Sequence, residues 1–279
     1  MTEPLILEQI PVQEGDLLAS LAEISGLSRT ALKRAASRGA LWLNSGAHHR
    51  RIRRFTGKFS ADDTLSLFYD PDLLAMEPPQ PTCHFDGDSF SVWYKPVGLL
   101  SSGSRFADHF AIDRWIETRQ ERATFLVHRL DRIANGLMVL AHDRKTAASL
   151  SEQFRNRQVT KVYRAVADGN INADVTLAEA LDDKPSVSHI HVVTTDSQKQ
   201  LTLLDVQIDT GRRHQIRRHL AGCGHPLSGD HLYGSETSYE PVLTAWQLAF
   251  AHPQTAEPLQ FSISPPDFTA LVIRPAAAL

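Results

Sequence analysis

The chain has 279 residues, of which 42% are hydrophobic, and its two cysteines lie far apart. This length predicts a folded core in one or two domains, and the cysteine usage argues against a disulfide scaffold or a thiolate zinc site. The amino terminus lacks the features of a signal peptide, and no apolar run is long enough to span a bilayer. We therefore expect a cytoplasmic protein with no membrane partner.

The net charge of −3 conceals a strongly basic segment. Residues 28–58 contain nine Lys or Arg and no Asp or Glu, so the rest of the chain carries −12. A basic face that only improves solubility is one explanation, but a segment without any acid favours a surface that binds nucleic acid. The candidate RNA-binding residues in this segment are Arg29, Lys33, Arg34, Arg50, Arg51, Arg53 and Arg54.

The first 70 residues predict a small mixed unit. Apolar residues at helical spacing predict a helix over residues 14–24 that ends at Gly26, and Ser28 is a suitable N-cap for a second helix over 28–37. Residues 40–46 and 64–70 alternate as strands do, and the segment between them, 47–58, is a basic loop too polar for a core.

A proline-rich stretch over residues 71–81 predicts a semi-rigid linker between an amino-terminal domain at 10–70 and a second domain at 82–279. The second domain alternates mostly between strands and a few helices, which predicts an α+β fold around a mixed, largely antiparallel sheet. Its expected strands are 90–95, 136–142, 159–169, 188–196, 201–209 and 258–264, and its expected helices follow Asp143 and cover 214–224.

One carboxylate, Asp131, lies between Arg129 and Arg132 just before a strongly apolar strand. Nearby positive charge favours the ionised carboxylate, which could attack an electron-poor carbon such as the anomeric carbon of a sugar. A structural ion pair explains the same residues, and the local pattern alone favours that simpler interpretation.

Two further stretches carry polar groups. Tyr163 lies in a predicted strand, where it could stack on a base or simply pack in the core. Arg213 and Arg217 are four residues apart, which predicts one shared helix face for binding an anion. The histidines at 214, 219, 225 and 231 do not match a metal-site spacing, so we expect neither a metal nor a cofactor.

Taken together and in order, five stretches resemble the RluA-type family of RNA pseudouridine synthases. They are YKPVGL, HRLDRIANGLMVLA, KVYRAVADG, GRRHQIRRHLAGCGHPLSGDHLYG and AWQLAFAHP, which begin at residues 94, 128, 161, 211 and 245. In addition, GLSRTALKRAASRGALWLNSG within the basic segment resembles the alpha-L RNA-binding module of a ribosomal small-subunit protein.

The resemblance implies a pseudouridine synthase fold and the isomerisation of uridine to pseudouridine in RNA, without cofactor or metal. It makes Asp131 the catalytic carboxylate and Arg217 the residue that pairs with it. It places Tyr163 against the target base, with a possible share in the final proton removal, and makes Arg129 the side chain that replaces the extruded nucleotide. The basic amino-terminal module favours a large structured RNA, with ribosomal RNA ahead of tRNA, and we expect a monomer.

The chain departs from the family's usual residues at several positions. Ala134 and Asn135 replace Thr-Ser, Arg213 and Arg218 replace Thr and Val, and Thr244 replaces a His. These changes concern target specificity more than chemistry. The alternatives are a catalytically silent RNA-binding or ribosome-assembly protein that keeps the fold and, with less support, a metal-dependent nuclease using the carboxy-terminal histidines.

Overall fold

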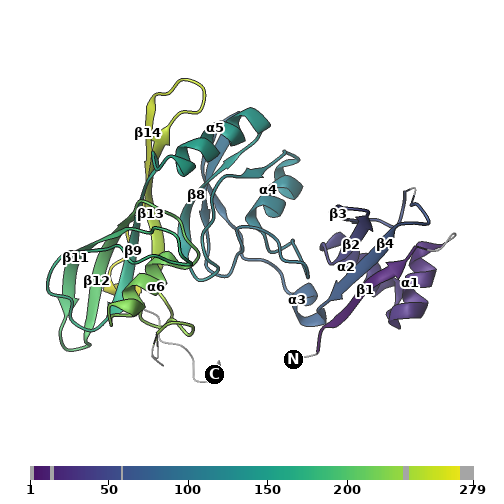
Figure 1. Cartoon of the computed structure of the whole chain (residues 1–279), viewed down its shortest axis with the longest axis horizontal. Coiled ribbons are helices and arrows are strands. Elements are labelled where there is room, and N and C mark those ends of the chain that lie inside the picture. Colours follow the sequence, from purple (N-terminus) through teal and green to yellow (C-terminus); the bar gives the residue numbers. More distant parts are fainter. Residues whose placement is uncertain (1–2, 13–15, 58, 235–238, 271–279) are drawn as a thin grey trace. The chain divides into compact units, whose positions relative to one another are not determined.

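The computed structural model describes residues 3–12, 16–57, 59–234 and 239–270, which form two compact units. One unit contains the chain up to Pro79 together with Ser102–Glu121, and the other contains Gln80–Ser101 and the chain from Arg122 onward. Figure 1 labels their helices and strands. No helix within the described residues is long and apolar enough to cross a membrane.

The described part of the first unit contains a four-stranded sheet and four short helices (Figure 1). The order of its strands is β1-β4-β2-β3, and all its pairings are antiparallel. The helices α1 and α2 bury their apolar side against the sheet, where Leu21, Leu32 and Leu67 are almost fully buried. The elements are β1 (Leu5–Pro11), α1 (Leu17–Ser25), α2 (Arg29–Ser37), β2 (Leu41–Ser45), β3 (His48–Arg51), β4 (Thr64–Tyr69), α3 (Pro71–Ala75) and α4 (Ile112–Gln120).

Both predicted helices of this unit form where their capping residues indicated. The hydroxyl of Ser28 accepts a hydrogen bond from the amide of Ala31 at 3.2 Å, and Gly26 adopts a left-handed conformation with φ of 69° after α1. The prediction of a basic loop over 47–58 is wrong in part, because residues 48–51 form β3 and Ile52 is buried. The strand β1 was not predicted.

The stretch predicted as a linker, 71–81, contains the helix α3. Asp70 caps this helix by accepting a hydrogen bond from the amide of Leu73 at 2.9 Å, and Leu74 is buried in the core of the first unit. The stretch predicted as a linker therefore includes residues, such as Leu74, that pack in the core of the first unit. Residues 102–121 also belong to this unit, although they follow the start of the second along the chain.

Asp108 joins the inserted segment to the basic residues of this unit. Its carboxylate is buried and accepts two hydrogen bonds from the guanidinium of Arg53, while the Arg51 Nε lies 3.6 Å from it. Arg51 also donates to the backbone oxygens of Gly39 at 2.9 Å and Ser104 at 2.5 Å. Arg51 and Arg53 are thus half-buried in structural contacts, whereas the other five candidate RNA-binding residues are exposed: Arg29, Lys33, Arg34, Arg50 and Arg54. Of these five, Arg29 lies 3.5 Å from Asp16 and Arg34 donates to the Ala75 carbonyl at 3.4 Å.

The second unit is built around a ten-stranded sheet (Figure 1). Its main order is β10-β11-β12-β9-β13-β8-β6-β5, with β14 beside β13 and β7 beside β8. Every described pairing is antiparallel except β13 with β8, which confirms the predicted α+β fold with a mixed, largely antiparallel sheet. The strands are β5 (Thr82–Asp86), β6 (Phe90–Lys95), β7 (Phe125–Leu126), β8 (Asn135–Ala141), β9 (Thr160–Asp168), β10 (Val175–Leu177), β11 (Ser188–Asp196), β12 (Leu201–Ile208), β13 (Leu243–Ala251) and β14 (Pro258–Ser262).

Two α-helices lie against this sheet. The helix α5 (Arg144–Arg155) is capped by Asp143, as predicted, and packs against β7 and β8 with Leu150 fully buried. The helix α6 (Gln215–Gly222) contacts β11. A short 3-10 helix, η1 (Phe268–Ala270), ends the described chain. The prediction for residues 214–224 is confirmed for the helix, but β13 at the centre of the sheet was not predicted from its pattern.

We expect the buried Asp108 to stabilise the first unit far more than exposed charge pairs do. The Asp108→Ala change leaves two arginines without their shared carboxylate, which should lower the free energy of unfolding by about 3 kcal/mol. The matched control is Glu77→Ala, which removes the exposed partner of Arg38 and should change stability little. Urea unfolding followed by circular dichroism measures both, and equal effects would contradict the assignment.

Candidate active site

The loop between β7 and β8 holds Asp131 at the start of the buried strand. The Ser101 hydroxyl accepts a hydrogen bond from the Leu130 amide at 2.9 Å and donates one to the Leu130 carbonyl at 2.7 Å. The Asp131 carbonyl accepts from the Ala134 amide at 3.1 Å, which closes a turn. Leu130 and Ala134 are buried on either side, so the backbone fixes the position of Asp131, whose side chain keeps an exposed fraction of 17%.

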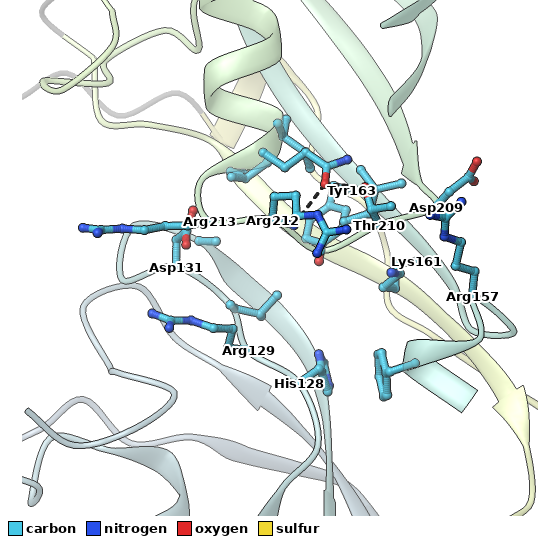
Figure 2. Close-up of a pocket in the computed structure, with 18 of the residues that line it drawn as sticks. His128, Arg129, Asp131, Arg157, Lys161, Tyr163, Asp209, Thr210, Arg212 and Arg213 are labelled. Atoms are coloured by element: carbon cyan, nitrogen blue, oxygen red, sulfur yellow. Dashed lines mark hydrogen bonds between the residues drawn. The ribbon is translucent and has the colours of Figure 1, made fainter. Parts of the chain in front are cut away.

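Asp131 lies in the wall of a cavity of about 610 Å³ formed by the second unit. The cavity is strongly basic, as Figure 2 shows. Its cationic lining residues are Arg129, Arg155, Arg157, Lys161, Arg212 and Arg213, and its carboxylates are Asp131 and Asp209. Such a charge balance suits a ligand that carries phosphate groups. Of these six cations, only Arg129 and Arg213 were predicted from the sequence to bind RNA or an anion.

Tyr163 lies on β9 and lines the same cavity (Figure 2), so its side chain lies on the face of the strand that borders the cavity. Its neighbours across the sheet are Val206 on β12 and Ala245 on β13. Only 7% of the residue is exposed, and this burial, together with the charge of Asp131, raises the pKa of the phenol above its ordinary value. At neutral pH the site therefore contains an uncharged tyrosine, whose phenol keeps its proton, near the Asp131 carboxylate.

Arg217 lies near Asp131 but has another carboxylate as its main partner. Its Nε and Nη2 donate to the two oxygens of Asp230 at 2.6 and 2.7 Å, whereas its Nη1 is 3.9 Å from Asp131 Oδ2. Burial alone would raise the pKa of Asp230, but the hydrogen bonds and charge of Arg217, together with hydrogen bonds from the amides of Leu232 and Tyr233, outweigh it and keep that pKa below its usual range. No local sequence pattern identified Asp230 as the partner of Arg217.

The prediction that Arg213 and Arg217 share one helix face is wrong. The helix α6 begins at Gln215, so Arg213 lies in the preceding turn, exposed at the cavity, while Arg217 is buried. Between them, His214 adopts a left-handed conformation with φ of 54°. Its Nδ1 is 3.0 Å from the Tyr233 hydroxyl, and its Nε2 is 3.8 Å from Asp131 Oδ1.

Two more buried groups lie close to this loop. The side chain of Lys95 is fully buried and donates to the backbone oxygens of Leu99 at 2.8 Å and Pro96 at 3.1 Å. Burial lowers its pKa to about 7, although the charge of Asp131 opposes that shift. Burial also lowers the pKa of His128 to about 3, and this neutral ring stacks on Phe154 and accepts a hydrogen bond from the Val139 amide.

Some of the departures from the family's usual residues contact one another. Asn135 and Thr244 are neighbours in the parallel pairing of β8 with β13, and the Thr244 hydroxyl donates to the Asn135 Oδ1 at 2.6 Å. Ala134 is buried in the cavity wall. Arg218 forms two hydrogen bonds with the exposed Asp182. Asn135 and Thr244 therefore bind each other within the sheet, and Arg218 forms an ion pair at the surface.

The histidines of the carboxy-terminal segment do not form a metal site in the structure. Across the described ranges, no three His, Cys, Asp or Glu side chains gather in an arrangement that could hold a metal ion. His219 bonds to the hydroxyls of Ser186 and Ser188, and the Nδ1 of His225 lies 2.9 Å from the Asp168 carbonyl. These contacts give both rings structural functions.

Comparisons with known proteins agree with this fold. Residues 89–222 match the family model described as RNA pseudouridylate synthase. The dual-specificity RNA pseudouridine synthase RluA of Vibrio parahaemolyticus is 31% identical over 195 residues, which cover 61% of this chain and 78% of that protein. The ribosomal large subunit pseudouridine synthase D of Nitrosomonas europaea is 32% identical over 221 residues, which cover 68% of this chain and 63% of that protein.

A solved structure shares the fold. Human RNA pseudouridylate synthase domain containing 1 superposes with a TM-score of 0.57 at 23% identity, over 69% of this chain and 86% of that chain. The family model and the relatives identify the chain as an RNA pseudouridine synthase, which is a class of isomerase. More specifically, the chain belongs to the RluA-type family.

We expect the Arg217–Asp230 pair to be essential for the stability of this site. The Asp230→Ala change leaves a buried guanidinium without its main partner and should cost about 3–5 kcal/mol of the free energy of unfolding. The matched control is Asp182→Ala, which removes the exposed carboxylate that pairs with the next arginine on the helix and should have little effect. Chemical unfolding measures both variants, and a stable Asp230→Ala protein would show that the pair does not hold the site together.

Proposed function

We propose that this chain isomerises uridine to pseudouridine in a structured RNA, with ribosomal RNA preferred to tRNA. The observation that carries the proposal is Asp131 in a basic cavity of the second unit, with the ring of Tyr163 beside it. A relative that acts on the large ribosomal subunit supports the choice of RNA.

In this proposal the ionised Asp131 attacks the sugar or assists the cleavage of its bond to N1 of uracil. The uracil then turns, forms a bond between C5 and the sugar, loses a proton from C5 and gains one at N1, so no redox partner is needed. Tyr163 provides an aromatic surface for the extruded base, Arg217 orients Asp131, and the exposed Arg129 fills the space that the nucleotide leaves in the RNA.

A second carboxylate in the cavity must be considered, because glycoside hydrolases use two. The cavity is lined by two carboxylates, Asp131 and Asp209, of which only Asp131 lies in a stretch that resembles the family. Asp209 lies 3.2 Å from the His189 Nε2, and its charge acts on Lys161, whereas that of Asp131 acts on Tyr163. We assign the reaction to Asp131 because it is the carboxylate whose charge reaches both Tyr163 and Arg217.

We predict that Asp131→Asn lowers the rate of pseudouridine formation by about 10⁴-fold or more, as the loss of a nucleophile does in other enzymes. Pseudouridine mapping in RNA from cells with and without the protein identifies the site, and the purified variant is then assayed on that RNA. The control is Asp209→Asn, which should keep the rate within about tenfold. If deletion removes no pseudouridine, the chain is a silent RNA-binding protein. If Asp131→Asn remains active, the reacting carboxylate is a different one.

We also predict that the exposed basic residues of the first unit bind RNA by charge. Changing Arg29, Lys33, Arg34, Arg50 and Arg54 to Gln should weaken RNA binding and flatten its dependence on salt, because each lost phosphate contact reduces the slope by roughly 0.7–0.9. The change of Arg51 and Arg53 to Gln should instead lower the stability of the unit. An unchanged salt slope in the fivefold variant would exclude this surface.

A further inference from the structure

Lys161 is a buried cation that the mechanism above does not use. It precedes Tyr163 by two residues on β9, so both side chains lie on the same face of the strand and line the cavity (Figure 2). Only 7% of the residue is exposed. Within the described residues, its ammonium group has no hydrogen bond and no carboxylate within 4.0 Å, and it lies 5.9 Å from the centroid of the Phe154 ring.

The side chain of Lys161 is nearly buried at the cavity wall, which costs desolvation energy, and no ion pair or hydrogen bond of its ammonium group within the described residues offsets that cost. Burial lowers the pKa of Lys161 to about 8, and the charge of Asp209 opposes the shift. The group therefore remains mostly protonated at neutral pH and has donors available toward the cavity. An anionic ligand would supply the missing acceptors.

The cavity adds more positive charge around Lys161 than its two carboxylates can balance. Arg157 follows α5 in a left-handed conformation with φ of 59°, and its exposed side chain lines the cavity. Arg212 lines it as well and is held by hydrogen bonds to Pro185 and Gln215. Asp209 is the acidic group that lines this part of the cavity, and its Oδ2 lies 3.2 Å from the His189 Nε2. Figure 2 shows Lys161, Arg157 and Asp209 on the side of Tyr163 away from Asp131.

We propose that Lys161, assisted by Arg157, binds a backbone phosphate next to the extruded uridine. The inference rests on the proposed function, since it assumes that a uridine occupies the cavity against Tyr163. A phosphate fits the site better than a uracil oxygen, because the unpartnered ammonium lies among arginines and charged oxygens are their strongest acceptors. The site would then fix the position of the nucleotide while Asp131 reacts at the sugar.

The test compares uridine with uridine 5′-monophosphate and uridine 3′-monophosphate as probes in an NMR titration of the full chain. The wild type should bind one of the monophosphates about tenfold more tightly than uridine, in keeping with a hydrogen bond between charged groups. In Lys161→Met this advantage should fall below about threefold, while Lys161→Arg should retain part of it. The control Lys145→Met removes an exposed lysine of α5 and should keep the full advantage.

Three results would overturn the proposal. The first is that Lys161→Met still binds the monophosphates more tightly than uridine by the wild-type factor. The second is that Lys161→Met loses uridine binding as much as monophosphate binding, which would place Lys161 against the base. The third is that the wild type binds neither monophosphate. Circular dichroism of Lys161→Met confirms that the variant is folded. The assay of pseudouridine formation decides the proposed function separately, because a chain without activity could still show the phosphate advantage.

Discussion

The proposed active site depends on one buried charge pair, that of Arg217 with Asp230. Two carboxylates lie within reach of a single guanidinium, and their distances from it are unequal: 2.6 Å for Asp230 and 3.9 Å for Asp131. The closer carboxylate fixes the orientation of the guanidinium, so the more distant one keeps its oxygens available while remaining in a positive field. Asp230 thus holds Arg217 in place, while Asp131 remains available for the proposed reaction.

The local structure of the chain could be predicted well from its sequence. Capping residues placed the starts of α2 and α5, and apolar patterns identified β4, β6, β8, β9, β11 and β12. These predictions succeed because caps and alternation depend on residues close in sequence. The motifs that carry Asp131, Tyr163 and Arg217 were also recognisable, and the structure brings Asp131 near the other two.

What the sequence could not show depends on contacts between distant residues. The bonds from Arg53 to Asp108 and from Arg217 to Asp230 span 55 and 13 positions, and no local pattern indicates them. The same holds for Asn135 and Thr244, 109 residues apart, whose separate departures from the family become one hydrogen bond in the sheet. Lys161 was not selected from the sequence because no local pattern shows that this lysine is nearly buried and, in the part of the chain that the structure describes, lacks an acidic partner close by.

The burial of Tyr163 has a consequence for the movement of protons. Burial and the charge of Asp131 raise the pKa of the Tyr163 phenol, which disfavours the phenolate that would act as a base in the last step. In the proposed mechanism, the carboxylate released when the sugar re-forms its bond is another acceptor for the hydrogen that leaves C5. In that case a single acid would serve first as nucleophile and afterwards as base, and the aromatic ring would remain chemically unchanged throughout.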